Sequence, residues 1–290
     1  MNSAFTMYLA QAIHGLAYGM LLFLVASGLT LIFGMMGVLN LAHASFFMMA
    51  GYFCYTVLRL TGNFWMALLL APLCTAVLGV LVERFLLRKI HARGHIAELL
   101  LTVGIMWVIL EAVKVFWGTE SLVISTPESL KGLVSWGGLS YPVYRLFIIG
   151  LSLLVLGFLA LVLFQTRLGK IVRAAVSDAD MVNALGINVP QVFMLVFGIG
   201  TWLAGIAGVA AAPLLTVFPG MADQMGMDAF VVVVVGGLGS LSGAFWVSLM
   251  LGELNAFGIQ FIPKLAPVLM FAFMAIFLSL KPTGLFGERE

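Results

Sequence analysis

Near its N-terminus the chain reads Leu16-Ala-Tyr-Gly-Met-Leu-Leu-Phe-Leu-Val-Ala-Ser-Gly-Leu-Thr-Leu-Ile-Phe33, without one charged side chain. No Asp, Glu, Lys or Arg occurs in the first 58 residues. Of all 290 residues, 63% are hydrophobic and 9% are charged, and the mean hydropathy is +1.16. Soluble domains carry about a quarter charged residues, so this composition indicates an integral membrane protein. The net charge of +2 identifies no partner, and no nucleic-acid partner is expected.

Apolar runs of about 20 residues, the length that spans a bilayer, recur along the chain. We expect an all-α, polytopic integral membrane protein that forms a single membrane-embedded domain over residues 1–290. About eight transmembrane segments are predicted, near residues 9–33, 38–58, 63–83, 96–117, 143–165, 190–216, 228–252 and 259–280. Cys54 and Cys74 fall in these apolar runs and are expected to be small core residues, with neither a disulfide nor a metal site.

Two connections between these segments are basic, namely 83–95 and 166–190. The positive-inside rule places both in the cytoplasm, and the connection at 118–142 must then be external. Counting spans puts the N-terminus outside. It also puts the C-terminus outside, unless the segment at 228–252 is broken into two half-spans.

A glycine-rich stretch makes that break plausible, because each glycine inside a helix costs about 1 kcal/mol relative to alanine. The stretch reads Gly236-Gly-Leu-Gly-Ser-Leu-Ser-Gly-Ala244, and we expect a broken helix near 236–243. Non-helical backbone survives at membrane depth only where protein or a watery cavity covers it. The expected path-lining residues here are Gly236, Gly237, Gly239 and Ser240. Glu253 follows, as either a pore-lining group or an interface residue.

A second predicted break lies near 33–45, where Asn40, His43 and Ser45 interrupt two strongly apolar runs. One interpretation is a tight interhelical turn, with Asn40 capping the second helix and His43 hydrogen-bonded to backbone. The other is a discontinuous helix that lines a translocation path. Both can hold together. We expect the two breaks to face each other or a shared cavity.

The connection at 166–190 predicts a short amphipathic helix. Ser177 or Asp178 is the candidate N-cap, 179–185 the helix body and Gly186 the left-handed residue after it, with Pro190 in the first turn of the next span. A helix lying flat in the lipid headgroups would need large anchors such as Trp or Phe. Small residues instead favour docking onto a cytoplasmic protein: Ala174, Ala175, Ala179 and Ala184.

No catalytic constellation accompanies these segments. The sequence has no HExxH motif and no His pair at metal-ligand spacing, and Phe164 stands where a phosphate-binding loop needs its first Gly. Four acids are isolated within apolar surroundings: Glu98, Glu111, Asp228 and Glu253. Glu111 is expected to pair with Lys114 three residues on. We therefore expect no enzyme activity, no catalytic residue and no cofactor. If ATP drives the protein, another subunit hydrolyses it.

Four ordered blocks resemble the permeases of branched-chain amino acid ABC importers, the Liv-type subunits. They are Gly28-Leu-Thr-Leu-Ile-Phe-Gly-Met-Met-Gly-Val-Leu-Asn-Leu-Ala-His43, Arg173-Ala-Ala with Ala184-Leu-Gly-Ile187, Gly236 to Ala244, and Lys281-Pro-Thr-Gly-Leu-Phe-Gly287. The resemblance covers nearly the whole chain. Ala44 departs from the family's usual Gly, and Phe245 and Trp246 are bulky.

The resemblance implies a multi-pass permease of the bacterial inner membrane. It implies pairing with a second homologous permease, two cytoplasmic ATPase subunits and a periplasmic substrate-binding protein, with small amino acids as substrate. The loop around 173–186 matches the family's ATPase-coupling segment. The residues expected to couple are Arg173, Ala174, Ala175, Asp178, Ala179, Ala184 and Gly186.

The main alternative is an ion-coupled secondary transporter, or a facilitator for a small neutral solute such as urea or a short amide. An ion-coupled mechanism needs paired buried acids, which the opening spans lack. The sequence does not decide whether the substrate is a leucine-type amino acid, urea, an amide or another amino acid. It also leaves open the orientation of both termini, the exact number of spans, and whether the permease pair is a homodimer or a heterodimer.

Overall fold

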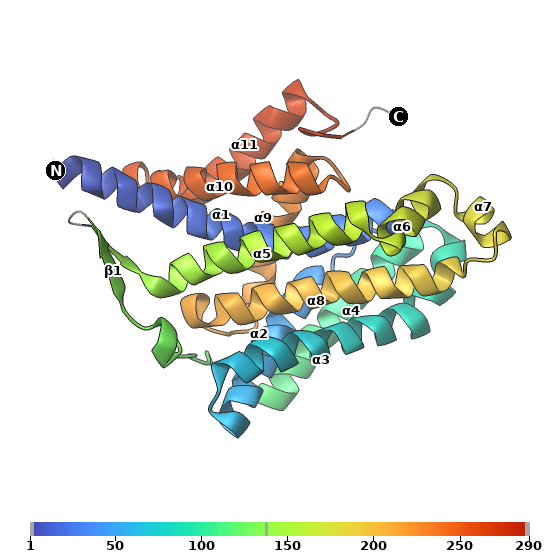
Figure 1. Cartoon of the computed structure of the whole chain (residues 1–290), viewed down its shortest axis with the longest axis horizontal. Coiled ribbons are helices and arrows are strands. Elements are labelled where there is room, and N and C mark those ends of the chain that lie inside the picture. The colour runs from blue at the N-terminus through green and yellow to red at the C-terminus, as the bar shows by residue number, and fades with distance from the viewer. Residues whose placement is uncertain (1–2, 137–138, 288–290) are drawn as a thin grey trace.

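The computed structural model describes residues 3–136 and 139–287, and it is almost entirely helical (Figure 1). The α-helices in chain order are α1 (Ser3–Met36), α2 (His43–Thr61), α3 (Phe64–Phe85), α4 (His95–Trp117), α5 (Val143–Gln165), α6 (Arg167–Ser177), α7 (Ala179–Ala184), α8 (Val189–Leu215), α9 (Met221–Gly236), α10 (Leu241–Phe261) and α11 (Ala266–Leu280). Single-turn 3-10 helices are η1 (Leu87–Lys89), η2 (His91–Arg93) and η3 (Glu128–Leu130). A hairpin of β1 (Leu133–Trp136) and β2 (Leu139–Pro142) pairs Leu133 with Pro142 and Ser135 with Ser140.

The all-α membrane class is confirmed, whereas the count of eight spans is not. Within the described residues, five helices are long and apolar enough to cross a membrane: α1, α3, α4, α5 and α8. The predicted segment at 228–252 is two separate helices, because α9 ends at Gly236 and α10 begins at Leu241. The predicted segment at 38–58 begins only at His43, since residues 37–42 are not helical. The loop at 166–190 holds two helices, α6 and α7, where one was predicted.

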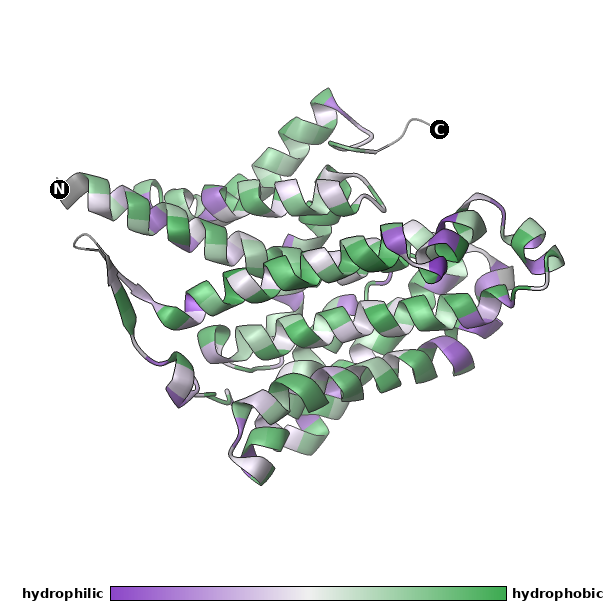
Figure 2. Cartoon of the chain, in the orientation of Figure 1, coloured by the Kyte–Doolittle hydropathy of each residue, from purple (hydrophilic) through white to green (hydrophobic). Residues whose placement is uncertain are grey.

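Helix α1 lies at the centre of the fold and contacts α10, α8, α9 and α5. Of its most apolar 18 residues, 78% are buried, against 22% for the corresponding windows of α4 and α5. Those outer helices have mean hydropathies of 2.1 for α4 and 3.0 for α5, against 2.2 for α1, and Figure 2 shows the α5 ribbon mostly in green. Apolar side chains that this chain leaves uncovered suit contact with lipid or with an apolar face of another subunit, so α4 and α5 form part of the outer apolar surface.

Glycine allows α1 to approach its neighbours closely. A Cβ atom added to Gly252 of α10 would lie 2.5 Å from the Cα atom of Gly19, and one added to Gly28 would lie 2.8 Å from the His43 ring. Small residues at such contacts are typical of membrane helix pairs, because lipid supplies no hydrophobic drive and association depends on packing. The α1–α10 contact therefore requires bare backbone on both sides.

The two ends of the helix array differ in what they carry. One end holds α6, α7 and the basic 3-10 turns, together with the C-terminal segment 281–287, whose Leu285 and Phe286 N–H groups donate to Val235 and Gly236 at 2.8 and 3.1 Å. The opposite end holds the hairpin and a bridge between Leu122 and Val217 (Figure 1). Splitting α9 from α10 thus brings the segment after α11 to the end that bears the basic loops.

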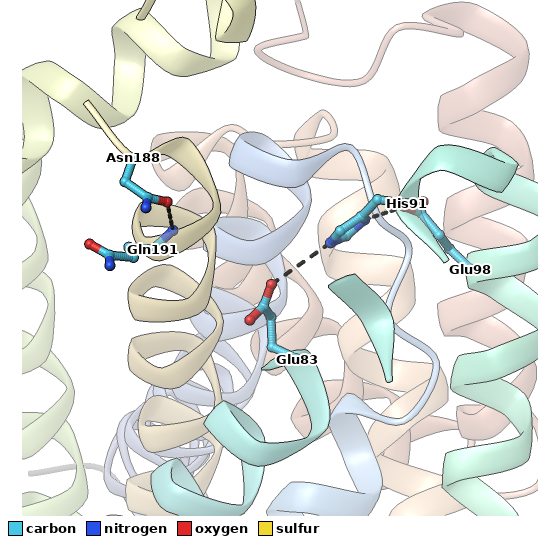
Figure 3. A network of polar contacts seen from close by, with 5 residues as sticks. All are labelled: Glu83, His91, Glu98, Asn188 and Gln191. Carbon is cyan, nitrogen blue, oxygen red and sulfur yellow. Dashed lines mark hydrogen bonds and ion pairs between the residues drawn. The ribbon is translucent and has the colours of Figure 1, made fainter. Parts of the chain in front are cut away.

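A polar network closes the basic end, between α3 and α4 (Figure 3). Glu83 has a side chain only 1% exposed, and its Oε1 lies 3.9 Å from Nε2 of His91. The other ring nitrogen of His91 is hydrogen-bonded to Glu98, which also lies 3.4 Å from His95. Glu98, expected to be isolated, therefore has partners. The nearby Glu83 carboxylate, reinforced by Glu98, raises the pKa of His91 in spite of its partial burial.

The glycine contact predicts a sharp difference between two valine substitutions. Gly252→Val should lower the thermal unfolding midpoint in detergent, because overpacking costs about 1–3 kcal/mol. Gly157→Val is the matched control, since a Cβ at Gly157 on the outer helix α5 meets nothing within 4 Å. Equal midpoints for the two variants would contradict the packing described.

The network predicts a pH-dependent contribution to stability. A His whose pKa is raised on folding stabilises the folded state fully below its unfolded value of 6.5, and the stabilisation is lost as the pH rises through the folded pKa. The thermal midpoint of the native chain should therefore exceed that of His91→Gln most at low pH, with the difference shrinking toward alkaline pH. A difference that stays constant or grows with pH would show that His91 is held neutral.

Candidate translocation path and coupling region

The break between α1 and α2 is a turn built around Asn40. Gly37 has a φ of +64°, which ends α1, and the Asn40 carbonyl then accepts from the His43 N–H at 3.1 Å. The Asn40 side-chain oxygen accepts from the Ala42 N–H, also at 3.1 Å. Ala42 is itself the N-cap of α2, so Asn40 closes the turn before the helix and does not cap the helix as predicted.

His43 is fixed by a backbone hydrogen bond, as one interpretation of the sequence predicted. Its Nε2 lies 3.0 Å from the carbonyl oxygen of Val25, in the middle of α1. A carbonyl only accepts, so Nε2 carries the proton and Nδ1 is left as an acceptor. The first turn of α2 therefore lies beside the middle of α1, and the break reaches well inside the helix array.

A cavity of about 370 Å³ lies at this break. It is lined by α1, the break, the first turn of α2, α4 and α9, and its polar lining includes Asn40, His43, Ser45 and Asp223. Within the described residues, Asn40 Nδ2, His43 Nδ1 and the Ser45 hydroxyl are buried without a hydrogen-bond partner. Such atoms cost free energy unless water or a solute meets them. Asn40, His43 and Ser45 line the cavity as residues, while these three atoms are themselves covered, and Asp223 joins the lining from the first turn of α9.

Asp223 was not among the predicted site residues. The predicted segment began at 228, whereas α9 begins at Met221 and brings the Asp223 side chain to the cavity. Asp228, expected to be isolated, accepts a hydrogen bond from the Tyr18 hydroxyl at 2.8 Å. Glu111 pairs with Lys114 at 2.7 Å, as predicted.

The glycine-rich break has different surroundings from the Asn40 turn. A Cβ at Gly239 would lie 2.7 Å from Gly34 Cα, and one at Gly237 would lie 2.5 Å from the Gly287 nitrogen. Ser240 caps α10 by accepting from the Gly243 N–H at 3.1 Å. Gly236 packs against Gly243. None of these residues lines the cavity at Asn40, His43 and Ser45. At the start of the predicted 33–45 break, however, Gly34 packs on Gly239, and Gly34 and Met35 line a different cavity together with Gly239 and Ser240.

Glu253 lies away from both breaks, toward the hairpin end. It packs beside Gly15 of α1 and lines a surface groove of about 560 Å³ with Trp246, Met250 and Phe273. The groove is otherwise apolar. The structure does not bring Glu253 together with the other predicted path residues.

Two caps shape the loop at 166–190. Thr166 accepts from the Gly169 N–H at 3.2 Å and starts α6, while Asp178 accepts from the Met181 N–H at 2.8 Å and starts α7. Gly186 follows α7 with a φ of +86°, and Pro190 lies in the first turn of α8. The Asp178, Gly186 and Pro190 predictions are confirmed. Helix α6 was missed, although Leu168, Val172 and Ala175 repeat at helical spacing.

The bend between α6 and α7 has its own small core. Ala175, Val182 and Val189 are each buried, with Ala179 half-buried against them and Phe193 joining from α8. Ala175 therefore holds the bend together and offers no surface for docking. The exposed predicted residues are Arg173, Ala174, Asp178, Ala184 and Gly186, beside the large apolar side chains of Met181 (57% exposed) and Leu185 (73%).

The bend also contacts the polar network. The rings of Phe193 and His91 lie 6.2 Å apart, edge to face. Asn188 caps α8 by accepting from the Gln191 N–H at 3.2 Å (Figure 3). The basic 3-10 turns and the α6–α7 loop thus form one connected surface at this end of the molecule.

This chain is similar to known permeases along nearly its full length. Residues 11–278 match the family of branched-chain amino acid transport system permease components. The chain is 30% identical to the high-affinity branched-chain amino acid transport system permease protein BraD of Pseudomonas aeruginosa, over 98% of this chain and 97% of BraD. It is 26% identical to LivH of Escherichia coli K12, a permease protein of the same kind, over 100% and 99%.

More distant similarity extends to another type of importer. The ribose import permease protein RbsC of Escherichia coli K12 is 25% identical, over 82% of this chain and 75% of RbsC. No solved structure matches the chain. The family match and the apolar helices make this a multi-pass protein of the inner membrane. The chain belongs to the family of branched-chain amino acid transport system permease components.

Proposed function

We propose that this chain is the membrane-spanning subunit of an ATP-driven importer that moves branched-chain or related small neutral amino acids into the cytoplasm. The observation that carries the proposal is the end-to-end similarity to permeases named for that transport, including BraD. Hydrolysis of ATP takes place on separate subunits. Their expected number is two, with a second homologous permease and a periplasmic binding protein completing the system.

The cavity at the Asn40 turn suits passage of a zwitterion. An ammonium or carboxylate left bare in a low-dielectric interior costs several kcal/mol, so each needs a polar partner on the way. Asn40 Nδ2 is a donor for the carboxylate, while His43 Nδ1 and Asp223 accept from the ammonium. Only one of these groups is charged. The contacts are therefore weak enough to release the solute, and the tight binding belongs to the partner that delivers it.

The α6–α7 loop is the proposed contact with the ATPase. Helix α7 lies between its N-cap Asp178 and its C-cap Leu185. The exposed apolar side chains of Met181 and Leu185 lie beside the small residue Ala184 at this helix. Its inner face packs on α8 through Val182 and Val189. A push on α7 is thus transmitted to α8, one of the helices that contact α1.

The cavity proposal predicts an unusual effect of Ser45→Ala. The Ser45 hydroxyl is buried without a partner, so its removal should leave stability unchanged or raise it by up to about 1 kcal/mol, while slowing amino acid uptake. Ser248→Ala is the matched control, because that hydroxyl is also buried but donates to the Phe245 carbonyl at 2.8 Å. The control should lose a little stability and keep its uptake. Full uptake by Ser45→Ala would remove Ser45 from the path.

The docking proposal is tested with Ala184→Trp in the reconstituted transporter, by ATP-dependent uptake of labelled leucine into proteoliposomes. The exposed Trp should obstruct the ATPase and lower both uptake and subunit assembly by about tenfold, equivalent to about 1.4 kcal/mol. Val134→Trp, at an exposed site in the hairpin, should leave both unchanged. Normal assembly of Ala184→Trp would exclude α7 as the contact. Uptake of leucine by the permease alone, driven by an ion gradient, would overturn the importer function itself.

A further inference from the structure

A second large cavity lies at the basic end, separate from the cavity at Asn40 and lined in part by Gly239 and Ser240 of the glycine-rich break. Its volume is about 450 Å³, and α1, α5, α6 and the start of α10 surround it. The wall is mainly apolar. Its residues on α5 are Leu156, Leu159, Ala160, Leu163 and Phe164.

This cavity opens on an apolar side of the molecule that the chain itself leaves uncovered. Helix α5 is one of the least buried spans, and its side chains at the basic end are largely uncovered, with Leu161 57% and Phe164 65% exposed. On α6, Val176 at the edge of the cavity is 51% exposed. An apolar molecule in the bilayer can therefore enter from the side, without crossing the protein.

Arg173 brings a positive charge to the edge of the cavity, where it lines the wall with Val172 and Val176. Helix α6 also carries Arg167 and Lys170, which are exposed like Arg173 but do not line the cavity. Helix α6 has no acidic residue to offset them. The part of the chain that the structure describes gives none of the three an ion-pair partner.

Arg173 is held over the cavity by two contacts. Its guanidinium donates to the Leu163 carbonyl and stands 5.6 Å from the centre of the Phe164 ring. A guanidinium has five N–H donors, so most of them remain for another acceptor. Ser240 and Ser242 add hydroxyl groups to the same cavity lining.

We propose that this cavity binds an anionic glycerophospholipid, with one acyl chain between α1 and α5 and the phosphate on Arg173. The apolar wall requires an apolar occupant, and Arg173 at its edge, on a helix with two further cations and no acid, favours an anionic one. Arginine suits a phosphate because it donates two parallel hydrogen bonds. The site lies where an apolar span meets a basic loop, which is the depth of the headgroups on the cytoplasmic side.

The bound lipid would connect elements that otherwise touch little at this end. It would contact α5 and α6 on one side and α1 with residues 239–242 on the other. Helix α6 begins the loop proposed to dock onto the ATPase, so an occupied site would hold that loop in position. The lipid proposal itself does not depend on the docking proposal.

The test is native mass spectrometry of the full chain in detergent, with phosphatidylglycerol and phosphatidylcholine of identical acyl chains. The native chain should retain phosphatidylglycerol about tenfold better. Arg173→Gln should abolish that preference. Arg84→Gln is the matched control, since Arg84 is exposed at the same end, also stands 5.6 Å from a neighbouring ring, and lies outside the cavity. It should behave as the native chain.

A second variant tests the acyl chain separately from the headgroup. Ala160→Trp fills the apolar wall and leaves Arg173 in place, so it should reduce retention of both lipids, with an unchanged thermal midpoint showing that the chain is folded. Equal retention of the two lipids by the native chain, or equal losses in Arg173→Gln and Arg84→Gln, would overturn the proposal. So would displacement by inorganic phosphate alone, or crosslinking at residue 173 to a second permease chain in place of lipid.

Discussion

A bilayer offers no water to backbone N–H and C=O groups, and this constraint decides where the chain can leave the helical path. Residues 37–42 do so beside the middle of α1, and 237–240 do so against the end of α1 and the C-terminal segment. Both breaks are covered by protein. The deeply buried central helix α1 provides that cover in both cases. Its glycines allow this, because Gly28 and Gly34 let His43 and Gly239 approach the α1 backbone directly.

The sequence predicted the class, the two breaks and most caps, because each depends on local chemistry. Apolar length, the glycine-rich run at 236–243 and the Asp178 cap are features that a helix or turn needs wherever it lies. Where α9 begins could not be predicted in this way. The first turns of this helix, from Met221, are polar, and they are held by packing against other helices that the local sequence does not reveal. Ala175 shows the same limit: a small residue on an amphipathic helix suits a docking face and a tight internal contact equally well.

The polar partners of acids were also hard to predict. Glu98 is isolated along the chain, and only the fold of the 3-10 turns brings His91 and Glu83 to it from the other side. The Asn40–Ser45 part of the first break and the glycine-rich break lie at different levels for a comparable reason. Each lies next to α1, but along different parts of it: Val25 holds His43, and Gly34 meets Gly239. Knowing that two segments both pack on α1 does not tell at which height along the α1 axis each of them lies.

The contact of Gly34, Gly237, Gly239, Gly284 and Gly287 has a mechanical consequence. Helices usually lock because ridges of side chains sit in the grooves of their neighbours, and sliding them requires rotamers to change. A seam made of bare main chain has no ridges. It instead sets main chain directly against main chain, so a side chain added at any of these glycines would force the contacting segments apart.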